Sequence, residues 1–156
     1  MIDAKEMALH NKFFDGMRPE HVNMIRNHAT EAQFKQGEML FKEQEPANRL
    51  YIIESGQVAI EAHEPADGTV TIETVGSGDV IGWSWLFPPF TWHFQARVLK
   101  PTTALVVDGA NLLTLAERDH TFGYDLMKRV AQIVIHRMEA TRKRLLEAEI
   151  ESALKG

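Results

Sequence analysis

The stretch from Leu40 to Phe87, LFKEQEPANRLYIIESGQVAIEAHEPADGTVTIETVGSGDVIGWSWLF, decides the fold. Short runs of Ile, Val, Leu and Tyr alternate in it with glycines, and Asp67-Gly68 is typical of a hairpin turn. Glycine reaches the backbone conformations that tight turns need. Antiparallel strands that reverse about every eight to twelve residues give this pattern. The stretch therefore predicts a small jelly roll or barrel.

Apolar runs on both sides of this stretch extend the predicted roll. Within residues 57–63, apolar residues alternate with others at the period of a strand. Pro19 suits the first turn of a helix that precedes the strands, with Val22 and Ile25 at helical spacing. We expect a mainly β fold, an eight-stranded antiparallel jelly roll with an N-terminal helix. Its predicted strands are 31–35, 39–42, 49–54, 57–63, 69–75, 80–81, 94–99 and 103–108.

The last third of the chain changes to a helical period. It predicts a short helix at 111–117 and a long one from about 120 to 153, so we divide the chain into a roll (1–118) and a long helix (119–156). Residues spaced alternately by four and three form a predicted heptad seam. These seam residues are Met127, Ala131, Val134, Met138, Thr141 and Leu145.

The length of this helix predicts a partner. At about 1.5 Å per residue it spans on the order of 50 Å, more than the roll can cover. We therefore expect a parallel homodimer through the long helix. The alternative is a monomer whose helix folds back, which the lack of glycine and proline from residue 124 to 155 disfavours.

Composition narrows the function classes. The chain of 156 residues has no cysteine, which excludes disulfides, thiolate zinc sites and cysteine nucleophiles and suits a cytoplasmic location. Its formal net charge of −5 argues against a broad nucleic-acid-binding face. No run approaches the roughly 20 apolar residues of a membrane helix, so no membrane association is expected.

Two motifs carry a resemblance to a known family: LYIIESGQV at 50–58 and GDVIG at 78–82. In combination, and with the order of the predicted elements, they make the chain similar to the sensory domain of the Crp/Fnr superfamily, which has the cyclic-nucleotide-binding fold. The resemblance covers the whole chain. It implies a non-catalytic regulatory module in which a ligand cassette lies against a dimerisation helix.

The ligand cassette departs from the family pattern. In the family, backbone amides after the GDVIG-like motif and a later arginine hold the cyclic phosphate, and a glutamate accepts a hydrogen bond from the ribose. Here Trp83 stands at the glutamate position and Trp92 at the arginine position, while alternation along the strand sends Arg97 outward. The resemblance makes these the candidate ligand-binding residues: Gly82, Trp83, Ser84, Trp85, Trp92 and His93.

Three interpretations of this cassette remain open. In the first, the aromatic rings fill the roll, and the protein is a structural interaction module without a ligand. In the second, the rings line a pocket for a flatter, more apolar ligand. In the third, a cyclic nucleotide binds in an altered pose. Ser84 and His93 would be the polar groups of the second kind of pocket.

The sequence disfavours two other classes of protein, metal enzymes and proteins that bind DNA directly. A cupin-like metal enzyme is not favoured, because the chain has no His-x-His pair and we expect no metal site. Full-length Crp/Fnr regulators continue into a DNA-binding domain after the dimer helix, whereas this chain stops at Gly156. The resemblance therefore implies that it acts without direct DNA contact, as a homodimer or through a protein partner.

Overall fold

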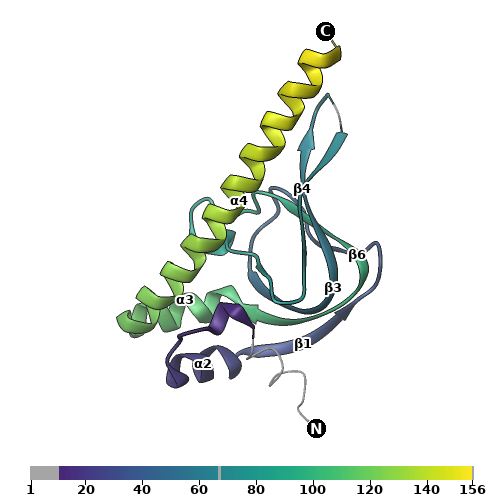
Figure 1. The fold of residues 1–156 in the computed structure, drawn as a ribbon. Coiled ribbons are helices and arrows are strands. Elements are labelled where there is room, and N and C mark those ends of the chain that lie inside the picture. Colours follow the sequence, from purple (N-terminus) through teal and green to yellow (C-terminus); the bar gives the residue numbers. More distant parts are fainter. Residues whose placement is uncertain (1–10, 67, 156) are drawn as a thin grey trace.

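The computed structural model describes residues 11–66 and 68–155, so the ends of both predicted domains and Asp67 of the predicted hairpin turn lie outside the described residues. A curled sheet forms the body, and a long helix runs along it and beyond it (Figure 1). The elements in chain order are η1 (Lys12–Phe14), α2 (Pro19–Arg26), β1 (Ala29–Phe34), β2 (Met39–Phe41), β3 (Arg49–Glu64), β4 (Gly68–Gly76), β5 (Val80–Ile81), η2 (Ser84–Leu86), β6 (Gln95–Asp108), α3 (Gly109–Arg118) and α4 (His120–Lys155).

The strands form one antiparallel sheet in the order β1-β6-β3-β4, with β2 paired to β6 and β5 paired to β3. The predicted antiparallel roll is confirmed, but its count of eight strands is wrong within the described residues. Two pairs of predicted strands are continuous, because β3 covers both 49–54 and 57–63 and β6 covers both 94–99 and 103–108. Shifts of register between Ile53 and Val58 bend β3 without interrupting its pairing with β6.

Gly56 makes this bend possible. Its φ is +108°, and a Cβ at this position would lie 2.6 Å from the Cα of Thr102 on β6. The sequence pattern correctly marked a change of direction at this glycine, but the change is a bulge inside a strand and not a turn between two strands.

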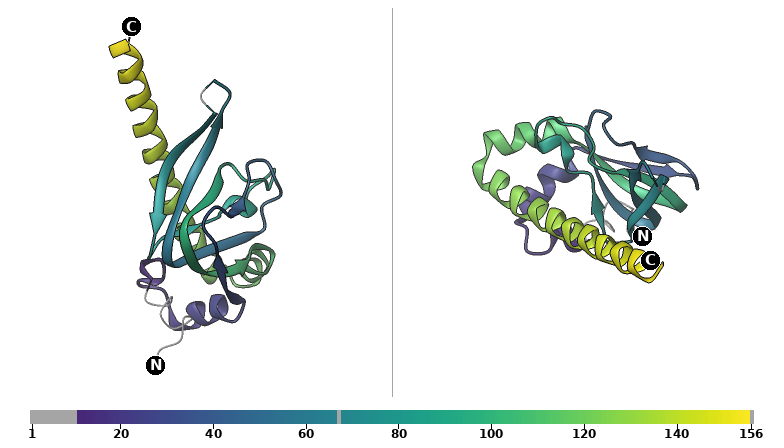
Figure 2. Two further views of the ribbon diagram at one scale, coloured as in Figure 1. Left: turned by 90° about the vertical axis from the view of Figure 1, so that its right-hand side faces the viewer. Right: turned by 90° about the horizontal axis from the view of Figure 1, so that it is seen from above.

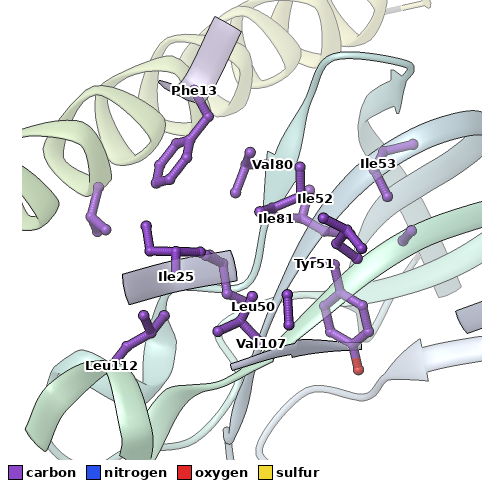
Figure 3. Close-up of a cluster of buried hydrophobic side chains, with 14 of the residues drawn as sticks. Phe13, Ile25, Leu50, Tyr51, Ile52, Ile53, Val80, Ile81, Val107 and Leu112 are labelled. Carbon is purple, nitrogen blue, oxygen red and sulfur yellow. The ribbon is translucent and has the colours of Figure 1, made fainter. Parts of the chain in front are cut away.

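The core fills the inside of the curled sheet and continues to the helices. Leu50, Ile52 and Ile53 of β3 are fully buried, as are Val98 and Val107 of β6. Figure 3 shows this cluster, with Ile25 of α2 and Leu112 of α3 packed against it. The N-terminal helix predicted from Pro19 is thus confirmed, with the proline in its first turn.

The long helix α4 is also confirmed, close to its predicted bounds. Asp119 begins it by accepting hydrogen bonds from the backbone N–H groups of Thr121 and Phe122, each at 3.1 Å. Phe122, Leu126 and Val130 are buried against the rest of the protein. From residue 145 to 155 every residue is exposed, and Figure 2 shows this end extending past the roll. No helix in the described residues has the length and apolar character needed to cross a membrane.

Candidate functional site

The predicted cassette begins at Gly82, directly after β5. Its φ is +93°, and a Cβ would lie 2.5 Å from the carbonyl oxygen of Arg49. Only glycine therefore fits at this position. The single turn of η2 follows, and a loop leads from it to β6. Near the end of this loop, Thr91 pairs with Pro46 in an isolated antiparallel bridge.

Two of the three indole rings are packed into the body of the protein. Trp92 is 4% exposed and stacks on Phe41, with ring centroids 3.9 Å apart. Trp85 is equally buried and its Nε1 donates a hydrogen bond of 2.9 Å to the carbonyl oxygen of Gly82. A Cβ on Gly109 would lie 2.6 Å from the Trp85 ring, so this indole is pressed against the first residue of α3.

The third indole lies at the rim with the polar residues of the cassette. Trp83 is half-buried and stacks on the imidazole of the exposed His93, at 4.9 Å between ring centroids. The Oγ of the buried Ser84 lies 2.9 Å from Nδ1 of His93. The two predicted polar groups are therefore hydrogen-bonded to each other.

The cavity that remains at the cassette is very small. Its volume is about 20 Å³, room for about one water molecule. Four of the six predicted residues line it, while Trp85 and His93 do not. The lining consists of Phe41, Ile60, Ile81, Gly82, Trp83, Ser84, Trp92, Phe94 and Arg137.

Arg97, the arginine nearest to the cassette in sequence, is engaged elsewhere. Its Nη2 lies 2.7 Å from Oε2 of Glu61, and the Gln95 amide also donates to this carboxylate. The hydrogen bond and the charge of Glu61 raise the pKa of Arg97. Ala96 and Val98 on either side are fully buried, whereas 44% of the Arg97 side chain is exposed.

Sequence reasoning missed Arg137, which reaches the cassette from α4. This side chain is only 7% exposed and forms an ion pair with Glu73 of β4. Burial lowers the pKa of Arg137, and the carboxylates of Glu73 and Asp79 partly offset this effect. The signal was available, since Arg137 continues the inner helical spacing of Leu126, Val130 and Ile133.

A second, larger cavity lies between α4 and the roll, with a volume of about 310 Å³. Arg137 lines both cavities and so stands between them. Residues of η1, β4, β5 and α4 surround the larger one. They are Lys12, Phe13, Glu73, Val75, Gly78, Asp79, Val80, Arg129, Gln132, Ile133, His136 and Arg137.

The predicted dimer seam lies on a flank of α4, about 100° around the helix axis from the residues buried against the roll, and its Val134 packs against the core. Met127, Met138 and Leu145 are 41%, 62% and 60% exposed, and Ala131 is exposed as well. Val134 and Thr141 are half-buried, and the Thr141 hydroxyl donates to the carbonyl oxygen of Arg137. Sequence reasoning missed further exposed apolar residues of α4 outside the seam, namely Tyr124, Ile135, Leu146, Ile150 and Leu154.

Within residues 11–66 and 68–155, no group of three or more His, Asp or Glu side chains is arranged to hold a metal ion.

Comparison with known proteins identifies the family. The model of the family described as "Cyclic nucleotide-binding domain" matches residues 31–119. A CRP-like cAMP-activated global transcriptional regulator of Mycobacterium tuberculosis is 26% identical over 136 residues, which are 86% of this chain. The chain spans 58% of the length of that relative.

Solved structures show the same fold. A protein of Geobacter metallireducens GS-15, named for cyclic nucleotide binding, superposes with a TM-score of 0.75 at 28% identity, covering 88% of this chain and 99% of its own. A cyclic nucleotide-binding domain of Methylobacillus flagellatus KT gives a TM-score of 0.77 at 22% identity, covering 92% and 80%. With the family model matching more than half of its residues, the chain belongs to the cyclic nucleotide-binding domain family.

Proposed function

We propose that this protein is a non-catalytic regulatory module with a degenerate phosphate-binding cassette, and that it acts as a dimer through α4. The observation that carries the proposal is the cavity of about 20 Å³ at the cassette, with the Trp92 ring buried at the position where the family has its arginine. A nucleotide needs far more space than this cavity offers.

The missing side chains support the same conclusion. Hydrogen bonds to charged groups contribute about 1.5–3 kcal/mol each, so losing both the acid and the guanidinium weakens binding by roughly a hundredfold or more. Arg97 does not compensate, because its donors are directed at Glu61 and it does not line the cavity. Cyclic AMP is therefore not expected to bind in the usual pose.

The exposed apolar face of α4 supports the dimer. Met127, Met138 and Leu145 lie on one side of the helix, about 100° around its axis from the buried Leu126, Val130 and Arg137. A second copy of the same helix would bury this face by heptad packing. Because the inner side of α4 carries Arg137, a change at the roll can bias how the two helices pack.

A structural interaction module without ligand is the second candidate. The same filled cassette favours it, since the stacked Trp92 and Phe41 rings complete the core without help from a ligand. The two candidates share the dimer and differ in whether any small molecule stabilises the protein.

Calorimetric titration with cyclic AMP tests the degenerate cassette. The full chain and the M. tuberculosis relative, which is cAMP-activated by name, are titrated side by side. We expect the Kd of this chain to be higher by about a hundredfold or more. Equal affinities would show that the cassette works in spite of its tryptophans.

Sedimentation of point variants tests the dimer. Leu145→Glu places a charge in the seam and is expected to give a monomer, because burying an unpaired carboxylate is strongly unfavourable. Lys143→Glu, exposed and outside the predicted seam, is the matched control and is expected to leave the dimer intact. A wild-type protein that sediments as a monomer at high concentration would contradict the proposal.

A further inference from the structure

We propose that the cavity of about 310 Å³ between α4 and the roll is a second ligand site, which takes a small organic anion consisting of an apolar body and one anionic group. The inference goes beyond the function proposed above, which concerns the cassette and the dimer seam. None of residues 82–93 lines this cavity, and only Arg137 is shared with the cassette.

The size and position of the cavity suit a ligand. Its volume lies at the lower end of the range of about 300–1,000 Å³ found for small-molecule sites. Lys12 and Phe13 of η1 line it, and this turn is held in place because Arg129 of α4 donates hydrogen bonds to the backbone carbonyl oxygens of Phe13 and Asp15. The walls therefore come from elements far apart in the sequence that are held together by defined contacts.

Arg137 supplies the main reason to expect an anion. The guanidinium has five N–H donors, and in the described part of the chain it makes one hydrogen bond, to Oε2 of Glu73. The side chain is 7% exposed and lines the cavity, so its unused donors can meet a ligand there. An anion in the cavity would accept hydrogen bonds from it.

The charges around the cavity favour the same sign of ligand. Three cationic side chains, Lys12, Arg129 and Arg137, line it against two carboxylates, Glu73 and Asp79. Lys12 pairs with Asp79 at 2.9 Å but is 71% exposed, so its ammonium can turn to a ligand at low cost. Each guanidinium nitrogen of Arg129 already donates a hydrogen bond, to Asp125 or to the carbonyl oxygens of Phe13 and Asp15. Arg137 and Lys12 are therefore the groups expected to hold the anionic group.

An apolar surface opposite these charges would hold the body of the ligand. Phe13, Val75 and Val80 are between 4% and 7% exposed and, with the half-buried Ile133, line the cavity. Figure 3 shows Phe13 and Val80 close to α4 on the side of the roll. Burying an apolar group of a ligand against them is favourable by roughly 25 cal/mol per Å².

Phenyl phosphate is the probe for this site, because it joins an aromatic ring to one phosphate group. Calorimetric titration of the full chain is expected to show saturable binding of about one molecule per chain. Inorganic phosphate lacks the apolar body and benzyl alcohol lacks the charge, and each is expected to bind at least about tenfold more weakly, a difference of about 1.4 kcal/mol.

Three variants locate the binding. Arg137→Gln and Lys12→Glu are each expected to weaken phenyl phosphate binding at least about tenfold. Lys12 is so exposed that its substitution leaves the core untouched, so the test holds even where Arg137→Gln fails to fold. Arg97→Gln removes an arginine that is also paired with a glutamate but lies outside the cavity, and it is the matched control with unchanged affinity.

The inference is overturned by any of three results: no saturable binding, the same affinity in Lys12→Glu as in wild type, or inorganic phosphate binding as tightly as phenyl phosphate. Failure of the proposed function is measured separately, by cyclic AMP titration and by sedimentation. A monomeric protein that binds phenyl phosphate through Lys12 would refute the dimer and leave this site standing.

Discussion

Tyr51 combines a buried ring with a polar end. The side chain is 2% exposed, and its hydroxyl donates a hydrogen bond of 3.2 Å to the carbonyl oxygen of Leu40. Burial raises the pKa of Tyr51 above its usual value, and Arg49 offsets part of this effect. The folded protein therefore favours the neutral phenol, and ionisation at high pH works against folding.

We predict that Tyr51→Phe lowers the free energy of unfolding by about 0.5–1.5 kcal/mol at pH 7, through loss of the hydrogen bond. Because the folded-state pKa is raised, the contribution of Tyr51 is complete below its unfolded pKa of about 10 and is lost as the pH rises through the folded value. Urea unfolding at pH 7 and at about pH 10.5 should show the gap between wild type and variant shrinking.

The control for this experiment is Tyr124→Phe, since Tyr124 is the other tyrosine of the chain and its side chain is 70% exposed. It should leave both the stability and its pH dependence unchanged. A gap between wild type and Tyr51→Phe that stays constant with pH would contradict the role of burial.

Individual residues near one another in sequence were the easiest to place. Gly82, Trp83, Ser84 and Trp92 lie around one cavity because a glycine motif and a strand fix the path of a single loop. Arg137 could not be paired from sequence alone. Its partner Glu73 lies 64 residues away on another element, and helical spacing indicates the inner face without indicating what the face meets.

The contact between α3 and α4 depends on a glycine. A Cβ on Gly123 would lie 2.8 Å from the carbonyl oxygen of Ala116 and 3.3 Å from its Cβ. The two helices therefore approach each other at a distance that no larger residue allows. This approach sets the direction in which α4 leaves the roll.

Gly123→Ala is predicted to destabilise the protein despite the better helix propensity of alanine. The propensity gain is at most about 1 kcal/mol, whereas overpacking costs about 1–3 kcal/mol. Thermal unfolding should show a lower Tm. Ser152→Ala, on the exposed end of α4, isolates the propensity effect and should not lower the Tm. An unchanged or higher Tm for Gly123→Ala would mean that the two helices separate easily.

The sequence predicted correctly which segments are helices and which are strands, but it predicted breaks within two strands that are continuous. The helices at 19–26 and 120–155 were found from proline placement and periodicity. The breaks expected near Gly56 and Pro101 do not exist, because β3 and β6 stay paired through several register shifts. Glycine and proline mark where a backbone bends or loses a hydrogen bond, and a bulge in a strand needs the same residues as a turn.

The shape of the whole molecule exposes a long apolar face on α4. If two copies bury this face, unfolding is coupled to dissociation and the Tm depends on protein concentration. A tenfold rise in concentration should stabilise the dimer by about 1.4 kcal/mol, which is about 0.7 kcal/mol per chain and raises the Tm by roughly 1.5–3 °C for a chain of this size. Leu145→Glu should abolish the dependence. Calorimetric scans over a hundredfold range of concentration measure both, and a constant wild-type Tm argues for a monomer.

Helix α4 has no interruption from His120 to Lys155, and it carries the buried Arg137 next to the exposed Met138, about 100° apart around its axis. A ligand bound beside Arg137 and a second copy of the chain bound along Met138 would thus contact the same continuous helix. By thermodynamic linkage, the factor by which the ligand changes the affinity of the two chains for each other equals the factor by which pairing of the chains changes the affinity for the ligand.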